Sequence, residues 1–589
     1  MSKVFHITSF LGECLQRALA TSGIESTERD ARIQPSDPRL GDFQANGLMA
    51  LAKSQKTSPL SLAEQVMCSL EVDEEWRKTE IKAFVSGPGF ITFQLSDAFL
   101  LHWLNRYKKE ECLKRDAGQR LLGRKVVIDY SSPNTAKQMH VGHLRSMIIG
   151  ESLQRLLRFC GAEVIRDNHI GDWGTQFGIL ILMLKRHSFD FEKNSSDILK
   201  TLEALYKEGV ALTKADENLL NEARRELVLL QQGDRTNMSL WQRINDISYR
   251  AFEEIYDEMD VHFDCVLGES FYRDQVDRVL RELEEIGVAE VSEGALVVRH
   301  REHSRFCEQP FLIRKKDGAS NYATTDLATL LYRVEHFHTD EIIYVTDGRQ
   351  QDHFQQLFLT AEAWFAQKNY VLPILKHVWF GTILGKDGKA IKTRSGEPVH
   401  LRELMEEAKS RAYAIVSEKN PHLLEEEKRQ IARVVGLGAI RYADLSQNRT
   451  HDYAFSWGKL LSFEGNTAPY LLYALARIRS IFRKVAPPLR EESTTVDMAM
   501  IGTAEERALA KKLVLFPYAL GQAIEDLCPH FLCTYLYELA EIFSSFYNTN
   551  RILDEEKTVT VRRLALCSRT GLMLKQGLTL LGMETLEKM

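Results

Sequence analysis

The chain has 589 residues, of which 44% are hydrophobic and 27% charged, and 76 Lys and Arg against 82 Asp and Glu give a formal net charge of −6. This ordinary globular composition excludes a disordered or collagen-like chain, and the length predicts about three to four domains. The net charge does not indicate a nucleic-acid partner, so a polyanion would have to bind a local basic face.

The apolar and cysteine patterns are typical of a cytosolic protein. The longest uninterrupted apolar run, Phe177–Leu184, is far shorter than the roughly 18 residues that a membrane span needs. Charged residues interrupt the N-terminal apolar stretch, so we do not expect a secretory signal. The nine cysteines are scattered and odd in number, which favours reduced thiols. Cys528 and Cys533 flank His530, but two thiols and one imidazole do not complete a zinc site, and no metal site is predicted.

Residues 1–115 predict a separate α+β domain. Helical periodicity runs through Ile7–Ala20 and Leu60–Leu70. Val85–Gln94 reads as a pair of strands that meet at a Gly-Pro-Gly turn. A basic stretch, Lys114–Lys125, follows and is interpreted as a linker.

Beyond the linker the pattern becomes that of a parallel α/β sheet. Val126–Tyr130 is an apolar run of strand length, 131–138 is a polar loop, and a helical stripe extends from Gly142 to Gly161. Glu163–Arg166 then reads as a second strand. This strand–loop–helix–strand unit predicts a Rossmann-type, doubly wound catalytic domain over 116–400.

The rest of the chain is mostly helical in pattern. A helical insertion is expected at about 185–292, and Glu341–Thr346 is the clearest later strand, followed by the loop Asp347–Gln350 and a helix. Residues 401–589 predict an all-α bundle domain. Within it, Ala486–Thr503 carries two prolines and a Ser/Thr cluster, and we expect an exposed loop there.

The segment richest in chemical groups is Ser131–His143 (SSPNTAKQMHVGH), which joins a predicted strand to a predicted helix. Backbone N–H groups and the dipole at a helix start favour an anion. Gly142 between His140 and His143 lets a flat ring lie against the backbone, and Lys137 adds a positive charge. The combination favours an ATP site over a polar loop with two surface histidines.

His140-Val141-Gly142-His143 resembles the HIGH signature of class I aminoacyl-tRNA synthetases. The longer string SSPNTAKQMHVGHLRS and the string HIGDWGTQFG at 169–178 resemble arginyl-tRNA synthetases specifically. The resemblance implies an enzyme that activates arginine with ATP, releases pyrophosphate, and transfers arginine to the 3′ end of its tRNA. Further matches follow in order along nearly the whole chain: NYATTD (321–326), DGRQ (347–350), YADLSQNR (442–449), GNTAPY (465–470) and METLEKM (583–589).

The resemblance also implies the amino-acid site. Selecting arginine requires a carboxylate that accepts a guanidinium fork. Asp326 and Tyr322 match the family's residues for the arginine side chain, and Glu269 matches a second acidic residue. Asn134 and Gln350 match groups that hold the amino-acid backbone. From the residues alone, Asp326 also fits a helix N-cap and Glu269 a solvated loop acid.

The family's second signature, KMSKS, corresponds to Lys389–Gly396 (KAIKTRSG), where two of its lysines are replaced. Lys137 matches a lysine just before HIGH that arginyl enzymes are thought to use instead. This departure leaves the roles of Lys392 and Arg394 open. No protein nucleophile is needed, because the reaction requires positioning and neutralisation of phosphate charge.

By the resemblance, residues 1–115 bind the tRNA elbow and 401–589 bind the anticodon. Basic side chains neutralise phosphates and aromatic rings stack on unpaired bases, although a basic run is also typical of a solvated helix face. Strand alternation puts one of Phe90 and Phe93 in the core. Tyr535, Tyr537 and Phe546 are expected in the core rather than against bases. The tRNA candidates are Phe90, Gln94, Arg477, Arg479, Arg483 and Met589.

Two rival interpretations stay open on the residues alone. Another class I synthetase would share the fold, but a cysteinyl enzyme needs zinc ligands and a glutamyl enzyme a basic pocket. An RNA-binding protein descended from a synthetase would not need Lys137 and the histidine–glycine–histidine set, all of which are intact. The expected partners are ATP with Mg²⁺ held mainly by phosphates and water, L-arginine and an arginine tRNA, with a cytoplasmic monomer as the form implied by the resemblance.

Overall fold

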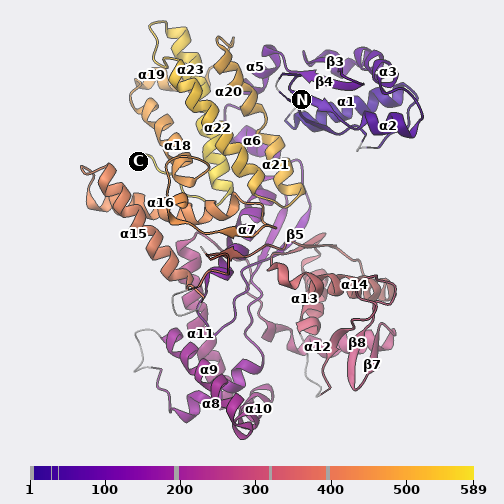
Figure 1. The fold of residues 1–589 in the computed structure, drawn as a ribbon, viewed down its shortest axis with the longest axis vertical. Helices are drawn as coiled ribbons and strands as arrows, with labels where there is room; N and C mark the ends of the chain where they lie inside the picture. Colours follow the sequence, from indigo (N-terminus) through magenta and orange to yellow (C-terminus); the bar gives the residue numbers. More distant parts are fainter. Residues whose placement is uncertain are drawn as a thin grey trace. The chain divides into compact units, whose positions relative to one another are not determined.

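A computed structural model describes residues 5–27, 30–37, 39–191, 198–316, 322–385, 387–392 and 398–589. The chain forms two compact units (Figure 1). The first unit comprises Met1–Arg120 together with Ser462–Met589, and the second comprises Leu121–Leu461. Each unit is built around its own sheet or helical core.

The N-terminal part of the first unit is an antiparallel sheet covered by helices, which confirms the α+β fold predicted there. Its strands run in the order β1-β2-β4-β3, and β3 and β4 meet at a turn where Gly87 and Gly89 adopt positive φ. Phe93 is buried in the core, whereas Gln94 is exposed. The elements are α1 (Ile7–Thr21), β1 (Ile33–Pro35), β2 (Phe43–Ala45), α2 (Leu48–Ser54), α3 (Pro59–Val72), α4 (Glu74–Arg77), β3 (Lys82–Ser86), β4 (Phe90–Gln94), α5 (Asp97–Arg106) and α6 (Glu110–Ala117).

The C-terminal part of the first unit is all helical, as predicted. One expectation is wrong: the loop placed at 486–503 contains a helix, α19, because a proline at the first helical position needs no N–H donor and suits the helix start. Tyr535 and Phe546 lie in the core of this part, as expected, and Tyr537 is half-buried. The helices are α18 (Ala468–Arg483), α19 (Pro487–Thr495), α20 (Ala504–Val514), α21 (Phe516–Glu525), α22 (His530–Thr549) and α23 (Lys557–Leu580).

The second unit contains the predicted Rossmann-type sheet. All strand pairs in this sheet are parallel, and the strands lie in the order β11-β10-β5-β6. Helix α7 connects β5 to β6. Strand order therefore reverses between β5 and β10, whose last residues pair as Asp129↔Tyr344. Ligands of such sheets bind at this switch point, beyond the carboxyl ends of the strands. The elements are β5 (Lys125–Asp129), α7 (Val141–Phe159), β6 (Glu163–Asp167), α13 (Tyr322–Phe337), β10 (Glu341–Tyr344), η3 (Gly348–Gln350), α14 (Gln351–Lys368) and β11 (Ile374–His377).

A helical insertion follows β6 and is visible as one group of helices in Figure 1. Its core includes Phe177, Leu202, Leu230 and Ile244, one from each helix. This arrangement places α9 and α11 beside the loop after β5: the Lys137 ammonium lies 5.1 Å from the centre of the Tyr206 ring of α9, and the Ala136 N–H donates to the Ser248 hydroxyl of α11 at 2.9 Å. The helices are α8 (Thr175–Arg186), α9 (Ile198–Ala215), α10 (Glu217–Gln231) and α11 (Arg235–Glu258).

The remaining elements of the second unit flank the parallel sheet. An antiparallel sheet β7-β8-β9 shares a core with α12, α13 and α14. Helices α15 and α16 pack against each other and belong to this unit. The domain boundary expected from the sequence at residue 400 stays a prediction. The elements are η2 (Glu269–Tyr272), α12 (Arg273–Glu285), β7 (Ala289–Ser292), β8 (Ala295–Val298), β9 (Phe311–Arg314), β12 (Ile383–Leu384), α15 (Leu401–Lys419), α16 (Glu425–Leu445), β13 (Tyr453–Ala454) and α17 (Trp457–Leu460).

Candidate active site

His140 and His143 form a linked pair at the start of α7. The His140 Nδ1 accepts the Gly142 N–H at 3.0 Å, and the His140 N–H donates to the His143 Nδ1 at 3.1 Å. Burial lowers the pKa of both rings, that of His143 to about 3, so both are neutral near pH 7. Because each Nδ1 is an acceptor, we assign the ring proton of each to Nε2. The pair therefore offers two neutral N–H donors at a helix N-terminus.

Gly142 is required by the packing of this pair. A Cβ at this position would lie 2.7 Å from the His140 Cε1. A side chain would therefore push the ring away from the helix start, where backbone N–H groups favour an anion. The sequence-based reason for a glycine here was space for a flat ring of the ligand; within the protein, the nearest ring is that of His140.

Lys137 supplies a positive charge close to the histidines. Its Nζ lies 5.1 Å from the centre of the Tyr206 ring of α9, a cation–π arrangement. Its charge contributes to the lowered pKa values of both His140 and His143, so its ammonium group lies within electrostatic range of both rings. Of the other candidate cations, Lys392 is exposed and Arg394 lies outside the described residues.

The chain that follows the KMSKS-like segment is tied to the entry of α7. The Val141 N–H donates to the Val399 carbonyl at 2.9 Å, and the Leu401 N–H donates to the Met139 carbonyl at 2.9 Å. This pairing brings His400 against His140. Sequence reasoning missed His400, because nothing in the local pattern links segments so distant in the chain.

Asn134 is held where the loop after β5 meets the HIGDWG segment. The Thr135 N–H donates to the Gly171 carbonyl and the Gly171 N–H donates to the Pro133 carbonyl, both at 3.1 Å. A Cβ on Gly171 would lie 2.1 Å from the Asn134 Oδ1, so the amide side chain occupies the space that the glycine leaves. The contact fixes Asn134 in the loop beyond the carboxyl end of β5, against the segment that follows β6.

Glu269 and Asp326 form the predicted pair of carboxylates. Burial raises the pKa of Glu269 to about 7, and the charges of Asp326 and Asp172 add to this rise while His169 opposes it. Asp326 and Glu269 therefore lie within electrostatic range of each other. Asp326 lies one turn inside α13, which starts at Tyr322, so the N-cap interpretation is wrong.

Tyr322 and Gln350 lie at the ends of two elements around this pocket. Tyr322 is the first residue of α13 and is 72% exposed. Its phenol interacts with that of Tyr206, which also carries the Lys137 ammonium on its ring. Gln350 ends η3 after β10 and is exposed. Both side chains are therefore accessible to a ligand at the carboxyl end of the sheet.

Asp172 fixes the loop that carries Glu269, a role that sequence reasoning missed. Its carboxylate accepts the Ser270 N–H at 2.8 Å, the Ser270 hydroxyl at 2.6 Å and the Tyr249 hydroxyl at 3.1 Å. A Cβ on Gly268 would lie 2.5 Å from that carboxylate, so only glycine fits there. Both Asp172 and Ser270 stand in short polar strings of the sequence, HIGDWG at 169–174 and GES at 268–270. The sequence does not show that these two strings lie against each other in the fold.

A buried network of ion pairs at the ends of β5 and β6 holds the loop after β5 in place. The Arg333 guanidinium, fully buried, reaches Asp129 at 2.6 Å and Asp167 at 2.7 Å. Asp129 also accepts the Ser132 hydroxyl at 2.9 Å. These carboxylates end β5 and β6, so the network holds the strand ends and the loop in register. Sequence reasoning missed Arg333.

Arg349, the third residue of DGRQ, is a second missed cation. Its guanidinium pairs with Asp347 at 2.7 Å and 3.0 Å. Its charge is among the causes that lower the pKa of His140, which places it near the histidine pair. It is therefore a further positive group beside the start of α7.

The tRNA candidates of the first unit have differing environments. Phe90 is half-buried and Gln94 exposed, so both are accessible. The Arg477 guanidinium lies 4.8 Å from the Tyr473 ring centre and 5.3 Å from that of Tyr547. Together they make a basic surface with two aromatic rings, the combination expected for an RNA contact.

Arg479 and Arg483 instead bind the end of the chain. Arg479 donates to the Leu586 carbonyl and to the Thr585 hydroxyl, the latter at 3.1 Å, and Arg483 donates to the Glu587 carbonyl. Arg479 also pairs with the Glu587 carboxylate at 3.3 Å. These contacts hold the segment that ends at Met589, and the sequence alone did not predict them.

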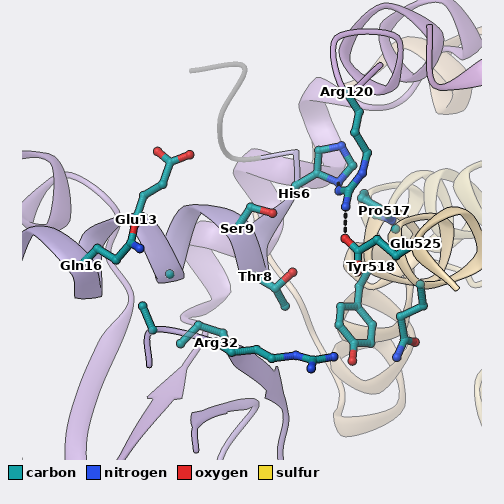
Figure 2. A pocket seen from close by; sticks show the side chains of 15 residues that line it. His6, Thr8, Ser9, Glu13, Gln16, Arg32, Arg120, Pro517, Tyr518 and Glu525 are labelled. Atoms are coloured by element: carbon teal, nitrogen blue, oxygen red, sulfur yellow. Dashed lines mark hydrogen bonds and ion pairs between the residues drawn. The ribbon is translucent and has the colours of Figure 1, made fainter. Parts of the chain in front are cut away.

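A separate cavity of about 480 Å³ lies in the first unit and is lined by none of the predicted site residues (Figure 2). Arg120 pairs with Glu525 on one side, and Arg32 extends toward Tyr518 on another. Burial, with the charge of Arg120, lowers the pKa of His6 to about 4. Two basic side chains, Arg32 and Arg120, and two acidic ones, Glu13 and Glu525, line the cavity, so their charges are equal in number and leave no excess that selects a ligand.

Neither a membrane span nor a metal cluster is found in the part of the chain that the structure describes. No helix there combines the length and apolarity that a bilayer crossing needs. Among the same residues, no three or more His, Cys, Asp or Glu side chains are grouped so as to hold a metal ion.

Three family models match the chain in sequence order. The model described as the arginyl tRNA synthetase N terminal domain matches residues 9–95. The catalytic-domain model of class I tRNA synthetases (R) matches residues 110–457. The DALR anticodon binding domain model matches residues 471–589. Together these matches extend along nearly the whole chain.

Whole-chain relatives agree with these models. Arginine–tRNA ligases of Chromobacterium violaceum and Cellvibrio japonicus are 42% and 43% identical to the chain, over 99% of it and 100% of each relative. The crystal structure of arginyl-tRNA synthetase from Plasmodium falciparum is similar with a TM-score of 0.85 at 28% identity, over 99% of both chains. The Thermus thermophilus arginyl-tRNA synthetase has a TM-score of 0.81 at 26% identity, over 99% of this chain and 100% of that one.

Proposed function

The chain belongs to the arginyl-tRNA synthetase family, and we infer that it is an arginine–tRNA ligase that activates arginine with ATP and transfers it to its tRNA. The observation that carries this inference is the whole-chain match to arginine–tRNA ligases, and it is supported by two acids within electrostatic range of each other, Glu269 and Asp326, and by a helix start that bears two neutral imidazoles. The carboxylates suit a guanidinium, and the helix start suits phosphate.

Activation needs no protein nucleophile. The arginine carboxylate attacks the α-phosphorus of ATP, pyrophosphate leaves, and the adenylate then acylates a ribose hydroxyl at the 3′ end of the tRNA. His140 and His143 donate Nε2–H bonds to phosphate oxygens, and Gly142 keeps the helix start open to them. Donors already in place at developing charge lower the barrier without reorganisation.

Lys137 supplies the fixed positive charge that the altered KMSKS segment lacks. Neutral imidazoles donate hydrogen bonds but do not offset the charge that builds on the phosphate oxygens. Lys137 lies within electrostatic range of both histidines, which supports this role. Lys392 and Arg394 are the competing candidates, and Arg349 joins them because its charge also reaches His140.

Arginine is selected by Asp326 and Glu269 around its guanidinium, with Tyr322 beside the side chain. Two carboxylates accept the five N–H donors of a guanidinium from two directions, which a lysine ammonium cannot match. Asn134 and Gln350 hold the amino and carboxyl groups of the substrate. The positions of Asn134 in the loop after β5 and of Gln350 at the end of η3 support this assignment.

The tRNA is held by the first unit, with Phe90 and Gln94 at its elbow. At the anticodon, Arg477 and its two tyrosine rings form the contact best supported by the geometry. Arg479 and Arg483 contribute to tRNA binding indirectly: they bind the last residues of the chain and so hold Met589 in position.

ATP enters as its Mg²⁺ complex, with the ion bound chiefly by phosphate oxygens and water. We place the enzyme in the cytoplasm as a monomer. All nine cysteines lie in the described part of the chain and none of them forms a disulfide, which supports a reducing compartment. Fractionation and analytical ultracentrifugation test these two assignments.

The decisive experiment is pyrophosphate exchange with each of the twenty amino acids, with and without tRNA. Exchange with arginine alone, in the presence of its tRNA, is the expected result. Exchange with another amino acid would assign a different class I synthetase. No exchange under any condition, with tRNA still bound, would instead indicate an RNA-binding protein that has lost the activity.

A further inference from the structure

The carboxylate proposed to bind the guanidinium already has a cationic partner within the protein. The His353 Nε2 lies 2.6 Å from the Asp326 Oδ2, and both side chains are largely buried, at 28% and 21% exposed. His353 lies in the first turn of α14, between the rings of Phe311 and Phe354. One oxygen of Asp326 is therefore occupied when no substrate is bound.

The same pocket holds a second group that binds a proton near neutrality. Glu269 titrates with a pKa of about 7, because burial and the charges of Asp326 and Asp172 disfavour its ionised form. Asp326 raises the pKa of His353 above its usual value, despite the opposing effect of burial. Without substrate, the pocket thus lowers its negative charge with protons on Glu269 and His353.

Arginine brings a permanent charge into this pocket, since its guanidinium stays protonated throughout the physiological range. A cation beside Glu269 favours the ionised carboxylate, and a cation beside His353 disfavours the imidazolium. Both effects act in the same direction. Binding of the substrate cation and loss of protons from the pocket are consequently linked.

We propose that arginine binding expels protons from the pocket, and that His353 is a specificity-determining residue that shields Asp326 until the guanidinium replaces its charge. This rests on the proposed arginine site. A neutral side chain entering the pocket would leave the protons in place and find Asp326 paired with His353. The pocket would therefore bind tightly only a ligand that carries its own positive charge.

Other titratable groups lie around His353, and those whose pKa values are shifted stay neutral between about pH 6 and about pH 8. Asp352, its neighbour on α14, is paired with Arg305 at 2.8 Å. His377 of β11 faces it with a pKa lowered to about 4, chiefly by burial, and so remains neutral. Tyr344 of β10 has its pKa raised by burial and also remains neutral.

Around Glu269, the Asp172 carboxylate accepts three hydrogen bonds. His169 is the remaining titratable neighbour, with its Nδ1 2.9 Å from the Leu267 carbonyl. The variant His169→Gln separates the contribution of His169 to the proton count from those of Glu269 and His353.

The sign of the pH dependence follows directly. Raising the pH removes protons from Glu269 and His353 before arginine arrives, so less free energy is spent on expelling them. Arginine affinity should rise from about pH 6 to about pH 8, by up to about tenfold per pH unit for each proton released.

Isothermal titration of L-arginine into the full-length protein tests the proposal, in two buffers of different ionisation enthalpy at each pH. The difference between the buffers counts the protons released. We expect net release near neutral pH for the wild type and a smaller count for both Glu269→Gln and His353→Gln. His353→Gln keeps a hydrogen-bond donor for Asp326 but cannot bind a proton, so its arginine affinity should depend less on pH between about pH 6 and about pH 8.

The matched control is His336→Gln, which makes the same change in the last turn of α13, where His336 stacks on Tyr332. Its proton count should equal that of the wild type. If the wild type releases no protons while Asp326→Asn still weakens arginine binding, the proposal is wrong and the arginine site stands. If neither Asp326→Asn nor Glu269→Gln changes arginine affinity, the site assignment itself is wrong. Release unchanged in both Glu269→Gln and His353→Gln would also overturn the proposal.

Discussion

The position of Asp326 within α13 decides between two roles for this residue, capping the helix and binding a substrate. An aspartate near a helix start usually caps the helix, which is why the sequence left two interpretations open. Because α13 begins at Tyr322, the Asp326 carboxylate points away from the free N–H groups and pairs with His353 instead. A carboxylate that is not needed for capping is available for a substrate.

Replacing Asp326 with asparagine keeps the shape of the side chain and removes its charge. Losing a charge-assisted pair with the guanidinium should cost about 2–4 kcal/mol, or roughly 30- to 1000-fold in kcat/KM for arginine. The KM for ATP should change little, because the phosphates bind at the start of α7. Steady-state kinetics at saturating tRNA provide the measurement. An arginine kcat/KM within threefold of the wild type would exclude Asp326 from the pocket.

The charge of Lys137 should matter mainly in the transition state. Lys137→Ala is expected to lower kcat about 10²- to 10³-fold with little change in KM, the pattern of an interaction made only as charge builds on the phosphate. Lys392→Ala, in the altered KMSKS segment, is the matched variant and should be milder. Single-turnover adenylate formation distinguishes them. A larger loss for Lys392→Ala would show that the KMSKS-like segment keeps the catalytic charge.

Among the elements, α7 was predicted well and α19 was not. The helix α7 has a strong apolar stripe and a cap at His140, both local signals. The prolines at the start of α19 are also local, but proline both breaks helices and starts them. Only packing of α19 on α23 decides which effect applies.

The packing of α7 on β5 can be tested through Gly150. A Cβ there would lie 2.3–2.6 Å from atoms of Tyr130, whose ring is fully buried. Gly150→Ala should therefore destabilise the second unit by about 1–3 kcal/mol through overpacking. Thermal unfolding should show a lower midpoint than in the wild type. Gly458→Ala is the control, since no atom lies within 4 Å of its added Cβ. Equal midpoints for the two variants would contradict the close approach of α7 to Tyr130.

At the scale of the whole molecule, the two substrates of low molecular weight and the tRNA contacts are assigned to different units. The ATP and arginine residues belong to the second unit, whereas the tRNA candidates belong to the first. Changes in the first unit should therefore affect tRNA use without altering arginine or ATP binding. This separation makes the tRNA surface testable by itself.

Reversing the charges of Arg479 and Arg483 together to glutamate should raise the KM for tRNA and weaken its salt dependence. The arginines bind the chain end, so removing residues 587–589 should reproduce much of the effect. The KM values for arginine and ATP should persist in both variants. Measurement of tRNA binding at two salt concentrations is the test. Unchanged tRNA KM in the double variant would show that this helix face is merely solvated.

The sequence by itself determined the α/β pattern, the helix that begins near Gly142 and the family. These depend on spacing between near neighbours, on caps and on ordered motifs, all of which are written along the chain. The tertiary structure alone decided which acids meet. Glu269, Asp326, Asp172 and His353 come from four separate segments, and strand order and helix packing bring them together. Their proton affinities depend on that burial and on those neighbouring charges, so no local pattern contains them.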